Sequence, residues 1–208
     1  MWYAALIAAL TAYLLGNLNG AVCVSALVAH DDVRKHGSGN AGLTNFIRNY
    51  GAANGLLVIA IDGIKAVLAC LAAGLILMPY GFPQEGMALG GLCVMLGHVF
   101  PALLGFKGGK GILSGLFVAI TIDWRIALLI LAVFAIAYGF TQYVSLGSVL
   151  AAAAFGIGFI LFHNSEVVVM LCGIAMGALA IYMHRDNIRR LLKGQERKTN
   201  LFRKGDSK

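Results

Sequence analysis

Long apolar stretches alternate with short polar segments along the whole chain. The apolar stretches cover residues 2–29, 52–78, 87–104, 112–122, 126–140, 147–163 and 167–183. A bilayer core of about 30 Å is crossed by about 20 helical residues, and inside lipid each segment must satisfy its own backbone N–H and C=O groups. The pattern therefore predicts a single all-α membrane domain over residues 1–208, with seven transmembrane helices.

The stretches 112–122 and 126–140 are the shortest, and only Asp123, Trp124 and Arg125 separate them. A single long helix over both stretches would give six spans. It would also place Asp123 and Arg125 near the middle of the membrane, where an ionised side chain costs at least about 2.5 kcal/mol. Two separate helices, and hence seven spans, are favoured.

Seven spans divide the polar segments into two sets with very different charge. Residues 30–51, 105–111, 141–146 and 184–208 together carry 14 Lys and Arg, whereas the opposite set carries only Arg125. Positively charged loops stay on the cytoplasmic side. The count therefore predicts an external amino terminus and a cytoplasmic carboxyl terminus. We expect residues 199–208 to form a flexible basic tail that meets anionic lipid headgroups.

The composition agrees with a membrane protein. Of the 208 residues, 60% are hydrophobic and 12% are charged, whereas soluble domains carry about 25% charged residues. Little chain is left for a large domain outside the membrane. The four cysteines lie singly inside apolar stretches, without the spacing of a zinc or redox site. We therefore expect no metal, no cofactor and, because the basic tail has no aromatic platform, no nucleic-acid partner.

The first cytoplasmic segment has the composition of a phosphate-binding loop. Its glycines let consecutive backbone N–H groups face an anion, and its polar side chains add further donors. An interfacial turn built from Gly and Asn is the plainer alternative. The length of the segment and its closing arginine favour a binding site, with the candidate residues Ser38, Gly39, Asn40, Thr44, Asn45 and Arg48.

The second cytoplasmic segment combines glycines with two lysines and precedes an apolar helix, whose amino end favours an anion. The candidates here are Lys107, Gly108, Gly109 and Lys110, with His98 just before them. The P-loop spacing fails at Leu104 and Gly111, so nucleotide hydrolysis is not expected. The plainer alternatives are an orientation signal for the lysines and a structural, hydrogen-bonded role for His98.

The remaining polar groups are weaker signals. Ser145 on its own resembles a helix N-cap. His184 and Asn187 are three residues apart and share a helix face, so both can reach one site. Asp62 and Lys65 are also three apart within an apolar stretch, and a structural ion pair is at least as good an explanation for them as catalysis.

Together these motifs resemble the bacterial acyl-phosphate-dependent glycerol-3-phosphate acyltransferases, which are small integral membrane enzymes. The resemblance runs from Tyr13 to about Lys198. It is carried by Ser38-Gly39-Asn40-x-Gly42-x-Thr44-Asn45, Gly97-His98-x-Phe100-Pro101, Gly105-Phe106-Lys107-Gly108-Gly109-Lys110-Gly111, Tyr143-x-Ser145-Leu146 and His184-Arg185-x-Asn187-Ile188-x-Arg190-Leu191. Asn17 and Asn19 stand where the family commonly has Ser and a following Pro, and Ala66 where Gly is usual, so a difference in helix packing is expected there.

The resemblance implies a reaction and a set of roles. A fatty acyl phosphate would donate its acyl group to the 1-hydroxyl of glycerol 3-phosphate, giving lysophosphatidic acid in a bacterial inner cell membrane. The implied catalytic residues are Lys110, Ser145, His184 and Asn187. The acceptor would be held by Arg48, Lys110, His184 and Asn187. The acyl phosphate would be held by Ser38, Gly39, Asn40 and Ser145. A soluble enzyme that makes acyl phosphate would be the functional partner.

A transporter or channel for a small phosphorylated anion is the alternative function. Glycine-rich segments with Lys and Arg at helix ends would serve transport as well. Permeation would be expected to mark both faces of the membrane, whereas all the polar motifs fall in the cytoplasmic set. Catalysis is therefore favoured.

Overall fold

A computed structural model describes residues 1–198, so the basic tail expected at 199–208 lies outside the described residues. The described chain forms ten α-helices and three short 3-10 turns, η1 to η3. They are α1 (Trp2–Gly16), α2 (Gly20–Ala29), η1 (Val33–Lys35), α3 (Leu43–Tyr50), α4 (Ala52–Leu77), η2 (Met78–Tyr80), α5 (Pro83–Val99), η3 (Ala102–Leu104), α6 (Ile112–Ile122), α7 (Trp124–Thr141), α8 (Val144–Phe162), α9 (Val167–Met183) and α10 (Arg185–Leu192).

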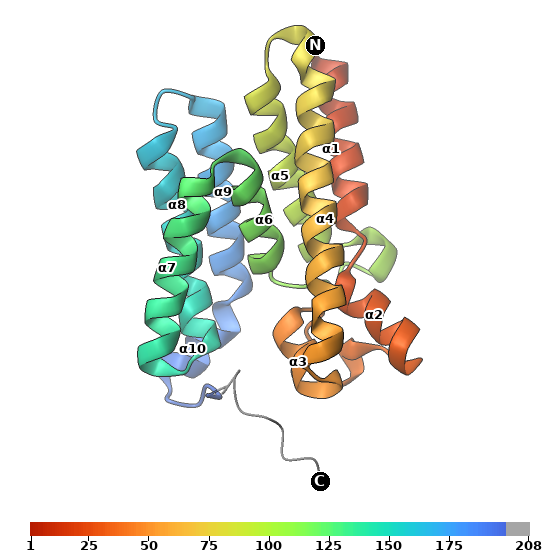
Figure 1. The fold of residues 1–208 in the computed structure, drawn as a ribbon, viewed down its shortest axis with the longest axis vertical. Helices are drawn as coiled ribbons and strands as arrows, with labels where there is room; N and C mark the ends of the chain where they lie inside the picture. Colours follow the sequence, from red (N-terminus) through yellow and green to blue (C-terminus); the bar gives the residue numbers. More distant parts are fainter. Residues whose placement is uncertain (199–208) are drawn as a thin grey trace.

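The long helices form a bundle of two joined groups (Figure 1). Helices α1, α4 and α5 pack against one another, while α8 lies between α7 and α9. Contacts between α5 and α9 join the groups, and the short α6 touches both. Glycines allow α1 and α5 to cross closely: a Cβ atom on Gly97 of α5 would lie 2.9 Å from the Cα atom of Gly16 on α1.

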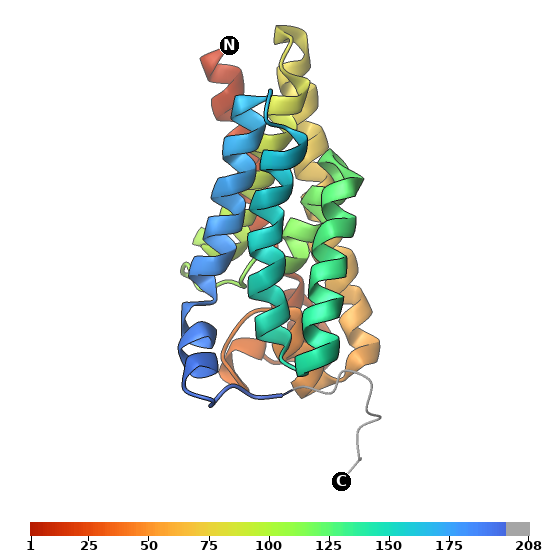
Figure 2. The same cartoon turned by 90° about the vertical axis from the view of Figure 1, so that its left-hand side faces the viewer.

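The bundle has one end rich in polar elements. Helices α2, α3 and α10 lie at this end, whereas the amino terminus and the α4–α5 turn lie at the other (Figures 1 and 2). We call the end that holds η1, α3 and α10 the polar end. The amino terminus and α10 therefore lie at opposite ends of the molecule, as an odd number of crossings would require.

Each predicted apolar stretch is helical, but the helices differ in their ability to cross a bilayer. Five spans are long and apolar enough, and the bent pair α9 and α10 is a sixth candidate. Helix α6 has 11 residues and is about 16 Å long, too short to cross a core of about 30 Å unaided. The seven-span count therefore stays a prediction, while the predicted break between α6 and α7 is confirmed at Asp123.

The first predicted span is a broken helix. The chain leaves the helix after Gly16, and Asn19 caps α2 by accepting a hydrogen bond from the Val22 amide at 3.0 Å. Asn17 accepts a hydrogen bond from the Leu103 amide, also at 3.0 Å. Asparagine favours caps over helix interiors because its side chain competes for backbone groups. The two asparagines noted in the sequence thus end α1, begin α2 and tie this break to η3.

Candidate active site

Polar segments that are far apart in the sequence surround one cavity at the polar end. The cavity has a volume of about 910 Å³. Its walls come from the loop before α3 and α3 itself, the loop before α6, the first turns of α8, and the chain from Met183 to Arg197. The fold thus brings all the polar motifs of the sequence together.

Most of the predicted site residues line this cavity. These are Ser38, Gly39, Asn40, Thr44, Asn45, Arg48, His98, Lys110, Ser145, His184 and Asn187. Lys107, Gly108 and Gly109 are not among the described residues that line it. Gly109 is buried against other parts of the chain. The two lysines of this segment have different surroundings, because Lys107 is exposed whereas Lys110 lines the cavity.

Asn45 shapes the loop that carries Ser38 and Asn40. Its side-chain nitrogen donates to the carbonyls of Val33, His36 and Asn40, each at 3.1 Å. Its side-chain oxygen accepts from the Ser38 amide at 3.0 Å. With its amide committed to the backbone, Asn45 fixes the conformation of the loop.

The loop before α6 folds back on the end of α5. The amides of Gly108 and Gly109 donate to the carbonyls of Val99 at 3.2 Å and His98 at 3.1 Å. A Cβ atom on Gly109 would lie 2.9 Å from the Ala41 carbonyl oxygen and would also meet the His98 ring. Glycine at this position lets the loop before α6 touch the segment before α3.

Lys110 is the lysine that faces the cavity. Its ammonium group donates a hydrogen bond to the side-chain oxygen of Asn187. Burial, and next the nearby Arg190 guanidinium, lower the pKa of Lys110 to about 8. An anion bound beside Lys110 would restore the preference for the charged ammonium.

Glu196 belongs to the same cluster and was missed in the sequence. Its carboxylate accepts a hydrogen bond from Asn187 Nδ2 at 2.9 Å and one from Arg190 Nε at 2.7 Å. Burial raises the pKa of Glu196, but these hydrogen bonds outweigh it and leave the pKa below its usual range. The available signal was a single acidic residue among the basic residues of 193–198, directly after α10. Asn187 is therefore held between Lys110 and Glu196.

His184 has a defined tautomer. Its Nδ1 atom lies 2.8 Å from the Ala180 carbonyl oxygen. Because a carbonyl only accepts, Nδ1 carries the proton and Nε2 keeps a free lone pair. Burial is the main cause that lowers the pKa of His184 to about 4. The imidazole is consequently neutral near pH 7 and able to accept a proton or a hydrogen bond.

Ser145 lies in the first turn of α8 and is not its N-cap, because the helix begins at Val144 after the cap residue Tyr143. The Ser145 hydroxyl oxygen is buried and lies beside the Glu196 carboxylate, but it makes no hydrogen bond of normal geometry within residues 1–198. Buried hydroxyl groups usually have a partner. This one lines the cavity, where a substrate oxygen can supply the partner.

A buried ionic cluster lies beside the cavity, on α4 and α5. The Lys65 ammonium is 2.7 Å from the Asp62 carboxylate and 2.8 Å from Nδ1 of His98. Lys65 also donates to the carbonyls of Gly16 and Leu18 at the end of α1. The predicted Asp62–Lys65 ion pair is confirmed. It joins α4 to the break between α1 and α2.

The cavity also has an apolar part. It is formed by side chains of α6, α7 and α8, namely Leu113, Leu116, Ile130, Leu131, Phe134 and Ala151. The polar part holds the cationic side chains of Arg48, Lys110 and Arg190. This combination suits an amphiphile with an anionic head and an aliphatic chain. The described residues contain no group of three or more His, Cys, Asp or Glu placed to hold a metal ion.

Comparisons with known proteins agree on one family. The family model described as glycerol-3-phosphate acyltransferase matches residues 6–194. The glycerol-3-phosphate acyltransferase of Clostridioides difficile is 39% identical over 194 residues, covering 93% of this chain and 94% of that protein. That of Finegoldia magna is 37% identical over 193 residues, covering 93% and 95%.

Two solved structures share the fold. One is a crystal structure of PlsY (YgiH), an integral membrane glycerol 3-phosphate acyltransferase, in its glycerol 3-phosphate form. It matches with a TM-score of 0.84 and 34% identity over 96% of this chain and 99% of that one. The lysophosphatidic acid form of PlsY matches with a TM-score of 0.81 and 34% identity, over 94% and 95% of the two chains. Because the family match extends over nearly the whole chain and the fold agrees, this chain belongs to the glycerol-3-phosphate acyltransferase family of integral membrane enzymes.

Proposed function

We propose that this acyltransferase uses a fatty acyl phosphate as donor and glycerol 3-phosphate as acceptor, and releases lysophosphatidic acid and phosphate. The observation that supports this proposal best is the cavity itself, in which cationic and apolar walls are continuous. Both substrates carry a phosphate, and the donor and product carry an acyl chain. A cavity of this kind can hold both substrates at once.

The reaction needs orientation more than activation, because acyl phosphate already contains a good leaving group. The 1-hydroxyl oxygen attacks the carbonyl carbon, an ester bond forms, and the bond from that carbon to the phosphate oxygen breaks. Arg48, Lys110 and Asn187 would hold the acceptor phosphate. Ser38, Gly39, Asn40 and Ser145 would hold the donor, with the acyl chain along the apolar part of the cavity. Positioning and charge neutralisation can together supply most of the rate enhancement.

The hydroxyl proton has two candidate acceptors. One is the free lone pair on Nε2 of His184, and the other is a phosphate oxygen of the substrates. Transfer is direct in this proposal, with no acyl-enzyme, because no cysteine is among the described residues that line the cavity and the Ser145 hydroxyl makes no hydrogen bond there to a histidine that could activate it. Trapping of an acylated Ser145 under single turnover would contradict direct transfer.

The proposal includes a place in the cell. Seven spans with an external amino terminus would put the cavity on the cytoplasmic side of a bacterial inner membrane, where glycerol 3-phosphate is available. Acyl phosphate must then come from a reaction that transfers an acyl group to inorganic phosphate. A soluble enzyme of that class would be the functional partner.

The first experiment gives the detergent-purified protein labelled glycerol 3-phosphate and compares palmitoyl phosphate with palmitoyl-CoA as donor. Labelled lysophosphatidic acid from palmitoyl phosphate alone is expected. Equal product from palmitoyl-CoA would contradict the donor assignment. Product from neither donor, with folded protein, would contradict the proposed reaction and lead to flux assays in liposomes.

A further inference from the structure

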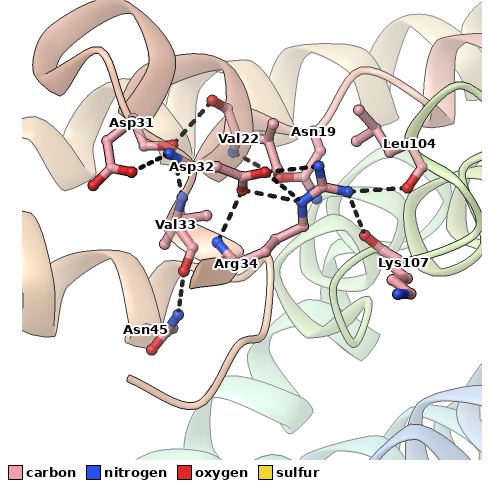
Figure 3. Close-up of polar contacts among 10 residues, drawn as sticks. Asn19, Val22, Asp31, Asp32, Val33, Arg34, Asn45, Leu104 and Lys107 are labelled. Carbon is pink, nitrogen blue, oxygen red and sulfur yellow. Dashed lines mark hydrogen bonds and ion pairs between the residues drawn. The ribbon is translucent and has the colours of Figure 1, made fainter. Parts of the chain in front are cut away.

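Arg34 links two of the segments that surround the cavity, although its side chain is not among the described residues that line it. It lies in η1 and reaches the loop before α6 (Figure 3). Its Nη1 atom donates to the Leu104 carbonyl at 2.9 Å and to the Lys107 carbonyl at 3.5 Å. The rest of the guanidinium pairs with Asp32 of its own turn.

The Asp32–Arg34 pair is joined by several hydrogen bonds. Arg34 Nε lies 3.0 and 3.1 Å from the two Asp32 carboxylate oxygens, and Nη2 lies 2.8 Å from one of them. The same carboxylate also accepts from the Arg34 amide at 2.9 Å. Such a forked pair fixes direction as well as distance. The remaining nitrogen, Nη1, is thereby aimed at the neighbouring loop.

The turn that carries the pair is itself anchored. The Val33 amide donates to the Ser25 hydroxyl of α2 at 3.2 Å, and the Val33 carbonyl accepts from Asn45 of α3 at 3.1 Å. Asn45 is the residue that shapes the Ser38–Asn40 loop. The position of Arg34 is therefore tied to that loop (Figure 3).

The carbonyls that Arg34 contacts lie on either side of a turn with unusual backbone angles. Gly105 and Phe106 have φ values of +66° and +60°. For phenylalanine this left-handed conformation is strained and persists only when surrounding contacts hold it. After Lys107, only Gly108 and Gly109 precede Lys110. The position of the turn therefore limits where the Lys110 ammonium can lie, together with the bonds of Gly108 and Gly109 to Val99 and His98.

We propose that Asp32 and Arg34 are positioning residues that hold the loop before α6 in register with the Ser38–Asn40 loop, so that Lys110 meets the substrate phosphate. The proposal rests on the proposed function, because it assumes that Lys110 contacts that phosphate. Neither residue touches substrate. Their effect is transmitted through the Leu104 and Lys107 carbonyls.

The chain offers a matched control. Asp123 and Arg125 form the same local arrangement, with the Arg125 amide 2.9 Å and Nε 3.0 Å from Asp123 Oδ1. This second pair lies at the α6–α7 turn, and the Arg125 guanidinium stacks over Phe162 at 4.5 Å. Arg125→Ala therefore removes an equivalent ion pair without touching either cytoplasmic loop.

The experiment measures kcat and both KM values for Arg34→Ala and Arg125→Ala, with the thermal midpoint of each. Arg34→Ala is expected to raise the KM for glycerol 3-phosphate about tenfold, while its thermal midpoint stays close to that of Arg125→Ala. Arg34→Lys, which keeps a donor but loses the fork, should restore part of the affinity. Equal KM values for Arg34→Ala and Arg125→Ala would overturn the proposal.

A double variant separates positioning from general destabilisation. If Arg34 acts through Lys110, Arg34→Ala should change the KM less than about twofold once Lys110 is already alanine. A full additional loss in that background would overturn the proposal. If Arg34→Ala cannot be purified, Asp32→Asn removes the ion pair while leaving Arg34 in place. An unchanged KM in Asp32→Asn would also overturn it. Failure of the wild-type enzyme to use acyl phosphate would count against the proposed function instead.

Discussion

At the residue scale, burial and immediate neighbours separate side chains of the same type. Lys107 and Lys110 lie in one glycine-rich loop, but Lys107 is exposed and Lys110 is partly buried beside Asn187. An exposed ammonium interacts weakly with anions because water screens it, whereas a desolvated one interacts strongly. The two lysines should therefore contribute unequally to phosphate binding.

Substitution of each lysine tests this difference. Lys110→Ala should lower kcat/KM about 10- to 100-fold, since it removes a charge-assisted contact. Lys107→Ala should lower it about twofold at most, because an exposed charge contributes little. Steady-state kinetics on both variants, after size-exclusion chromatography to confirm folding, provide the measurement. A larger loss in Lys107→Ala than in Lys110→Ala would contradict the assignment.

The pH dependence of binding should report Lys110. Its pKa of about 8 means that the ammonium loses its proton as the pH rises through that value. Glycerol 3-phosphate is already doubly ionised there, because the second pKa of a phosphate ester is about 6. The KM for glycerol 3-phosphate should consequently rise above pH 8, by up to about tenfold per pH unit.

The control for this profile is Lys110→Arg, whose guanidinium keeps its charge throughout the range. A variant that retains activity should have a flat KM profile from pH 7 to 9.5. A flat profile in the wild-type enzyme would show that Lys110 does not carry the charge that binds the phosphate.

At the element scale, the periodicity and length of the apolar stretches predicted where helices occur. The break at Asp123 followed from the cost of placing its carboxylate in lipid. The division of residues 2–29 into α1 and α2 did not, because it depends on contacts of Asn17 and Asn19 with distant segments. Glu196 was missed for the same reason, since only the fold brings it to Asn187. Hydropathy reports how well a segment suits lipid or water. It does not show which residues elsewhere in the sequence that segment will contact in the fold.

The Asp62–Lys65 ion pair holds α4 to the break between α1 and α2, so its loss should destabilise the protein. Lys65→Met leaves a buried carboxylate with few donors and should cost about 3–5 kcal/mol. For a chain of this size that corresponds to about 10 °C in thermal midpoint. The double variant Asp62→Asn with Lys65→Met should recover part of the loss, since no charge is then buried alone. The free energy of unfolding in detergent is measured for the two single variants and for the double variant. A loss in the double variant equal to the sum of the two single losses would contradict this coupling.

At the scale of the whole molecule, the short α6 raises the question of how far its turn reaches across the membrane. Figure 1 shows the α6–α7 turn short of the level reached by the α4–α5 and α8–α9 turns. Asp123 is buried at this turn, 2.6 Å from Arg125 and 3.2 Å from His163. These partners allow the turn to carry a charge without reaching bulk water.

If α6 and α7 form a complete hairpin across the membrane, the α4–α5 and α8–α9 turns lie on the same side. If the two helices were instead one continuous crossing, those turns would lie on opposite sides, although Figure 1 shows both turns at the end away from the polar end. A chain with its four cysteines replaced would carry Gln84→Cys, Asn164→Cys or Lys193→Cys one at a time, all at exposed positions. An impermeant maleimide should label Gln84→Cys and Asn164→Cys in intact cells, and Lys193→Cys only after permeabilisation. Labelling of Gln84→Cys and Asn164→Cys from opposite sides would exclude seven spans, because the seven-span order places both turns outside when the polar end is inside.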